Sequence, residues 1–90
     1  MLAKSANVIK LNYMNWKDAI TDPDERKVFS ALDGPEYTWR TVGGIARQAG
    51  LPDERVADIL KKYNLTLTRL SETPAVSGSA LFGLIEKVGV

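Results

Sequence analysis

The chain lacks cysteine and histidine altogether. It therefore cannot form disulfides, zinc sites of the finger type, Ser-His-Asp triads or Cys-His dyads, and only carboxylates, lysines, hydroxyls and tyrosines remain as catalytic groups. The clustered acidic residues, Asp22/Asp24/Glu25 and Asp53/Glu54, each stand at an expected helix start, where a carboxylate favours the helix dipole. We therefore expect no enzyme activity, no cofactor and no bound metal.

Long hydrophobic runs and a strong excess of one charge are also missing. No stretch approaches the roughly 20 apolar residues that a membrane span requires, and the first nine residues lack the pattern of a secretory signal. The 90 residues, 44% hydrophobic and 26% charged, are typical of one small globular domain. We expect a cytoplasmic protein without membrane contact. Its net charge of +1 predicts that a single copy binds nucleic acid weakly.

A first helix is expected over residues 23–32. Asp22 can cap it, Pro23 suits its first position, and Glu25 stands three residues after the cap to bond back to it. Gly34 is expected to end the helix in a left-handed conformation. The inward stripe of this helix would consist of Val28, Phe29 and Leu32.

Strand signals occur in three places. The run from Tyr37 to Thr41 is rich in aromatic and β-branched residues, which favours a short strand. Residues 65–70 alternate apolar and polar, and residues 80–85 are mostly apolar, so with the polar loop of residues 71–79 they predict a hairpin. A terminal helix stays open as an alternative, because a helical stripe is also formed by Leu81, Leu84, Ile85 and Val88.

Residues 1–20 have no clean period and are expected to be an N-terminal extension. The alternation over residues 8–13 suits a short strand, whereas Trp16 and Ile20 at helical spacing suit an extra helix. Either element would cap the fold or form a dimer surface.

Residues 42–62 read as two short helices broken at Gly50. Thr41 can cap the first helix, Gly50 permits a left-handed turn, and Pro52 sets the backbone angle at the start of the second. Apolar residues on the two sides of the break meet only if the second helix crosses the first. These residues are Ile45, Ala49, Leu51, Val56, Ile59 and Leu60. The layout is that of a helix-turn-helix.

The chain resembles the winged helix-turn-helix superfamily, best known from transcription regulators, at Ile45, Ala46, Ala49, Gly50, Leu51, Val56 and Ile59. Members place a helix and a short strand before the motif and a hairpin, the wing, after it, and the elements expected over residues 22–87 follow this order. The resemblance implies an α+β fold, a small winged helix with a three-helix core, over residues 21–90. The resemblance is specific for the fold but not for the function, since superfamily members also serve as protein-binding modules.

The resemblance also implies a nucleic-acid-binding surface. In such proteins the second helix enters the major groove of DNA while nearby cations hold phosphates. The residues expected to face bases are Pro52, Asp53 and Ala57, and those expected to hold phosphates are Arg40, Arg47, Arg55, Lys61 and Lys62. Arg69 completes six cations that stand against four acids between residues 34 and 70.

Two functions follow from this reading. The first, which the sequence favours, is a transcription-regulator type of domain that binds double-stranded DNA weakly or as a homodimer, since two copies would double the contacts. The second is a protein-interaction module, alone or within a larger protein. It remains open because Asp53, Glu54 and Asp58 lie on the helix expected to face DNA, and residues 71–79 contain no lysine or arginine.

Overall fold

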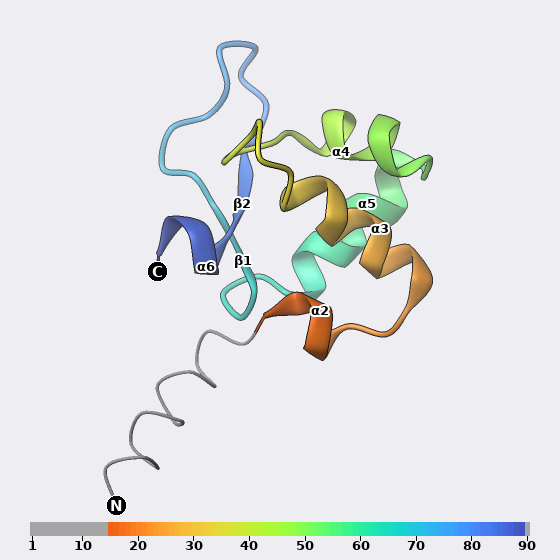
Figure 1. Cartoon of the computed structure of the whole chain (residues 1–90). Helices are drawn as coiled ribbons and strands as arrows, with labels where there is room; N and C mark the ends of the chain where they lie inside the picture. The colour runs from red at the N-terminus through yellow and green to blue at the C-terminus, as the bar shows by residue number, and fades with distance from the viewer. Residues whose placement is uncertain (1–14, 90) are drawn as a thin grey trace, which may run out of the picture.

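Residues 15–89, which the computed structural model describes, form an α+β arrangement of five helices and one two-stranded antiparallel sheet (Figure 1). The helices are α2 (Trp16–Ala19), α3 (Pro23–Leu32), α4 (Val42–Ala49), α5 (Asp53–Lys62) and α6 (Ile85–Val88), and the strands are β1 (Thr68–Leu70) and β2 (Phe82–Leu84). Nowhere in this range is a helix long and apolar enough to cross a membrane. The strand suggested for residues 8–13 lies outside the described residues.

Side chains cap helices α3 and α4 as predicted. Asp22 Oδ2 accepts a hydrogen bond from the backbone N–H of Glu25 at 3.0 Å, and Thr41 Oγ1 accepts one from that of Gly44 at 3.1 Å. Each bond satisfies a donor that the first turn of a helix leaves without a backbone partner. The starts of both helices are thus encoded locally.

Two predicted details of α3 are wrong. The carboxylate of Glu25 does not return to the cap but binds Lys62 and Tyr63, because burial of this side chain demands stronger partners. The helix ends at Asp33 with φ −88°, and Gly34 is not left-handed. Asp33 instead closes the turn through its N–H to the Phe29 carbonyl at 2.9 Å, while its side chain accepts from the indole of Trp16 at 3.0 Å.

The break between α4 and α5 is confirmed at Gly50. This residue has φ 71°, and both its N–H and that of Leu51 donate to the carbonyl of Ala46, at 2.9 and 3.2 Å. Only glycine adopts such a backbone without strain. Pro52 precedes the helix rather than opening it, and α5 begins at Asp53.

One hydrophobic core joins the helices and the sheet. The predicted inward residues of α3 and α5 and Ile45 of α4 are buried in it, with Phe29, Ile45 and Ile59 at 0 to 1% exposure, whereas Ala49 of α4 is only half-buried. Trp16 and Ile20, from the stretch expected to be an extension, are buried in the same core. The helical reading of this short segment is therefore confirmed for Trp16–Ala19.

The hairpin is confirmed, with shorter strands than predicted. Thr68 pairs with Leu84 and Leu70 with Phe82, and residues 65–67 turn instead, because Leu65 adopts φ 66° and donates its N–H to the Thr68 carbonyl at 2.8 Å. The strand expected over residues 37–41 is reduced to one bridge, between Arg40 and Phe82. At the C-terminal end both alternatives are partly right, because β2 runs directly into helix α6.

Trp39 packs across the base of this hairpin. A Cβ atom on Gly83 would lie 2.9 Å from the Trp39 ring and 3.0 Å from the Thr38 carbonyl, closer than side-chain atoms pack. Position 83 therefore accommodates only glycine while the indole stays in place.

Replacing Ile59 with Asp should abolish cooperative unfolding. The new carboxylate would lie unpaired among the helices, where desolvation costs several kcal/mol, a large part of the roughly 5–15 kcal/mol that stabilises a small domain. Thermal melting followed by circular dichroism measures this. Lys61→Asp, on the exposed side of the same helix, should melt like the parent protein. A parent-like melt of the Ile59 variant would contradict the core described here.

Candidate functional site

Helix α5 presents one row of charged side chains to solvent. Val56, Ile59 and Leu60 are buried, and the opposite side of the helix carries Glu54, Asp58 and Lys61 at spacings of four and three, all exposed. We call these three residues the outer row. It contains two carboxylates and one ammonium group, and the exposed Asp53 precedes it. The surface expected to meet DNA is therefore acidic.

Arg55 is turned toward α3 and its carboxylates. Its Nε lies 3.4 Å from Asp24 Oδ2, and its Nη2 lies 3.6 Å from Asp22 Oδ2. The three side chains are each about 40% exposed, so these contacts add little stability. They nevertheless place two negative charges beside the guanidinium, which weakens its attraction for a phosphate.

Lys62 serves as counter-ion to a buried carboxylate. Its Nζ lies 2.7 Å from Glu25 Oε2, and the hydroxyl of Tyr63 donates to the other oxygen of Glu25, which is only 5% exposed. The hydrogen bond to Glu25 raises the pKa of Lys62, and burial, followed by the bond to Glu25, raises the pKa of Tyr63. Lys62 therefore balances an internal charge, which its position in the sequence does not reveal.

Arg40 and Arg69 also make contacts within the chain. Arg40 donates to the carbonyls of Ala31 and Gly44 at 3.3 and 3.1 Å and to the side chain of Gln48. Arg69 lies over the ring of Trp39 and donates to the carbonyl of Gly89 at 3.3 Å. Carbonyl partners leave both positive charges without a counter-ion but fix the direction of each guanidinium.

The other residues predicted to bind DNA are less restrained. Arg47 on α4 and Lys61 on α5 are exposed, and within residues 15–89 neither forms an ion pair. Pro52 and Asp53 lie exposed at the start of α5, and Ala57 is half-buried beside them. The structure thus collects Pro52, Asp53, Ala57 and Lys61 on one helix, with Arg40 and Arg69 held elsewhere.

The acids that pair with α5 were not predicted from the sequence. Asp22, Asp24 and Glu25 were read only as cap and dipole residues of α3. Part of this pairing could have been inferred from helical spacing. Arg55 and Lys62 lie seven positions apart and therefore on one side of α5. That α3 would supply carboxylates to this side follows only from the packing of the two helices.

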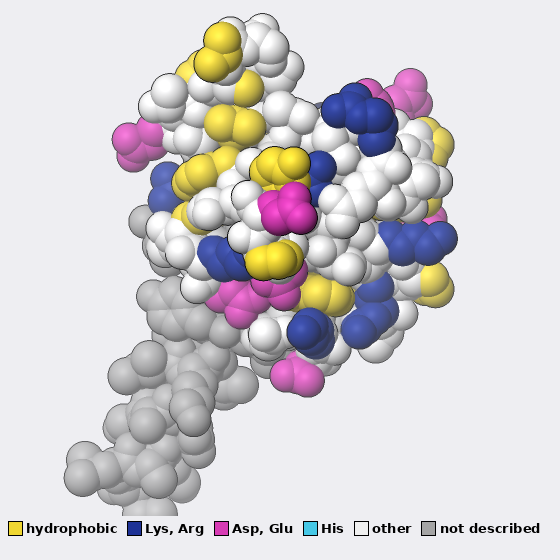
Figure 2. Space-filling view, turned by 45° about the horizontal axis from the view of Figure 1, so that its top comes forward, with side chains coloured by type: hydrophobic (Ala, Val, Ile, Leu, Met, Phe, Trp, Pro, Cys, Tyr) yellow, Lys and Arg dark blue, Asp and Glu magenta, His cyan; other side chains and the backbone are white. Residues whose placement is uncertain are grey.

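The loop between β1 and β2 carries no basic residue. Residues 71–81 include Glu72 and a fully exposed Val76, and the protruding tip in Figure 2 shows yellow and white surface without dark blue. A loop that grips DNA usually places a cation near the phosphates or in the minor groove.

Across residues 15–89, no three acidic side chains gather into a group able to hold a metal ion.

Glu25→Gln should reduce the loss of stability at alkaline pH. Because their pKa values are raised, Lys62 and Tyr63 keep their protons to a higher pH in the folded state than in the unfolded chain. The stabilisation that these protonated groups provide is complete below their ordinary pKa values and is lost as the pH rises through their folded-state pKa values. Urea unfolding between about pH 9 and 11 should show a steeper decline for the parent than for the variant. Glu36→Gln, at an exposed position, is the matched control. Equal slopes for parent and Glu25→Gln would contradict the pairing.

The chain matches no protein-family model, no curated protein and no solved structure. That the chain is a winged helix-turn-helix protein therefore stays a prediction, which rests on the residues around Gly50 and on the order of the elements. Function has to be inferred from the surfaces described above.

Proposed function

We propose that the chain is a winged-helix domain that binds another protein. The observation that carries the proposal is the charge of α5, where Arg55 and Lys62 are paired with carboxylates of α3 and the outer row holds two acids and one base. A surface of this kind attracts a basic or neutral protein surface and repels a polyanion.

The order and contacts of the elements support the winged-helix part of this proposal. Helix α3 packs against both α4 and α5, and α4 meets α5 across the left-handed turn at Gly50. The Arg40–Phe82 bridge brings the segment before α4 beside the hairpin, where the family has its first strand. In Figure 1 the β1–β2 loop extends away from the three helices, as a wing would.

Exposed apolar side chains around the hairpin also favour a protein partner. Leu65 is 72% exposed, Leu70 is 46% exposed and Val76 is fully exposed. Single exposed apolar residues are common, but three of them on the hairpin and the turn before it offer contact area that a phosphate backbone does not use.

Duplex DNA remains the second candidate because of Arg47 and Lys61. These exposed cations stand on the two helices of the turn and form no ion pair within the described part of the chain. A single copy would offer few phosphate contacts, so this function requires a homodimer.

Binding to random-sequence duplex DNA separates the two candidates. At about 50 mM salt the parent should show no measurable binding, because three carboxylates face the phosphates. The variant Asp53→Asn, Glu54→Gln, Asp58→Asn should acquire weak, salt-sensitive binding. A fluorescence anisotropy titration at several salt concentrations provides both measurements.

Arg47→Glu with Lys61→Glu is the control for the second candidate. Lys62 is left unchanged in this control because a glutamate at 62 would face the buried Glu25 and disturb the fold. Tight binding by the parent, with a salt slope that falls by about two in this control, would overturn the protein-binding proposal and favour DNA.

A further inference from the structure

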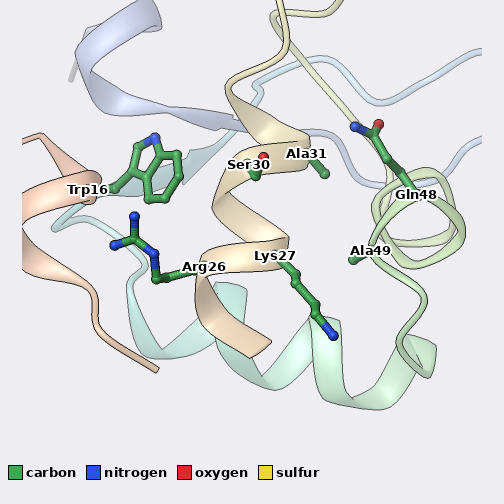
Figure 3. A pocket seen from close by; sticks show the side chains of 7 residues that line it. All are labelled: Trp16, Arg26, Lys27, Ser30, Ala31, Gln48 and Ala49. Carbon is green, nitrogen blue, oxygen red and sulfur yellow. The ribbon is translucent and has the colours of Figure 1, made fainter. Parts of the chain in front are cut away.

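A shallow hollow of about 480 Å³ crosses the outer face of α3. Figure 3 shows Trp16 of α2 and Arg26 of α3 at one side and Gln48 and Ala49 of α4 at the other, with Lys27 of α3 between them. Ser30 and Ala31 complete its lining, so apart from the aromatic Trp16 the side chains are cationic, polar or small, and none is acidic. The charge of its lining is therefore complementary to a negatively charged surface.

The cations of this hollow are not neutralised. The guanidinium of Arg26 donates to the carbonyls of Ile20 and Lys17 at 2.6 and 3.0 Å and lies over the Trp16 ring, which fixes its direction without supplying a counter-ion. Lys27 is exposed and, over residues 15–89, takes part in no ion pair. Asp18 is the single acidic residue of α2, and it does not line the hollow.

The α3 hollow and the outer row of α5 therefore carry excess unpaired charge of opposite sign. The carboxylates of α3 are used by α5, which leaves Arg26 and Lys27 on the outer face of α3. The carboxylates of the outer row, Glu54 and Asp58, have no basic partner within the described range. One surface is a hollow with excess positive charge, and the other is a convex helix with excess negative charge.

We propose that the α3 hollow binds the outer row of α5 from a second copy of this chain. Lys27 and Arg26 then face Asp58 and Glu54, and the small side chains of Ala31 and Ala49 let the incoming helix approach closely. A helix lying in a groove is a common mode of protein recognition. The inference rests on the proposed protein-binding function and identifies its partner.

Such a contact joins two different surfaces, so the association is head-to-tail. Each copy keeps a free hollow at one end and a free outer row at the other, and further copies add until a ring closes or a chain of copies extends. The near-zero net charge of +1 permits this, because like-charge repulsion between copies is small. Association is expected to be weak and sensitive to salt, since the charges involved are exposed.

Sedimentation velocity of the full chain over a range of concentrations tests the proposal. In low salt the weight-average sedimentation coefficient should rise with concentration, and near 1 M salt, where the screening length is about 3 Å, it should return to the monomer value. Lys27→Glu and Asp58→Lys should each weaken association by about tenfold, because each places like charges together. The double variant, which exchanges the two charges, should recover most of the association.

Glu72→Lys is the matched control, because it changes the net charge as much as Asp58→Lys does but lies in the β1–β2 loop. It should associate like the parent. A parent that stays monomeric in low salt, a double variant that does not recover, or a Glu72→Lys variant as weak as Asp58→Lys would each overturn the proposed contact. These measurements contain no DNA, so a monomeric parent that also fails to bind duplex overturns only this inference and leaves the protein-binding proposal standing.

Discussion

The buried carboxylate of Glu25 is the constraint on which the arrangement of α3 and α5 depends. A charge with 5% exposure is tolerated only when partners replace the water it has lost, and Lys62 and Tyr63 supply them from the end of α5. The pairing holds the start of one helix against the end of the other. It also means that the charge of Lys62 neutralises a buried carboxylate within the fold rather than a ligand.

The same side of α3 determines what α5 can bind. Asp22 and Asp24 lie beside Arg55, so the three acids that open α3 occupy two of the three cations on α5. What remains exposed is the outer row, with its two acids and one base. The preference for protein over DNA that we propose for α5 thus depends on a neighbouring helix, and the same pairing leaves the other cations of α3 available on its outer face.

Local features of the fold were predictable from the sequence because they depend on neighbouring residues. The caps at Asp22 and Thr41 and the turn at Gly50 need only a short side chain or a missing Cβ atom, and each was predicted correctly. The bounds of α3 were predicted correctly too, but the left-handed Gly34 expected after it was not found, and Asp33 instead pairs with Trp16, 17 positions away. The partners of Arg55 and Lys62 on α3 could not be predicted from neighbouring residues either, since they lie 31 to 37 positions away in the chain and are brought close only by the packing of the two helices.

The contact between Trp39 and Gly83 restricts which substitutions are possible at these two positions. The indole and the Thr38 carbonyl occupy the space that a side chain at position 83 would need, so a larger residue there requires both a smaller residue at 39 and a shift of the backbone at 38. Substitutions are restricted more strongly at these two positions than at the tip of the β1–β2 loop. The base of the hairpin must change in coordinated pairs, whereas the exposed residues around Val76 can vary in length and composition, apart from Gly78, whose φ of 90° favours glycine. Relatives of this chain should therefore differ most at the tip of the loop while keeping the angle at which it leaves the helices.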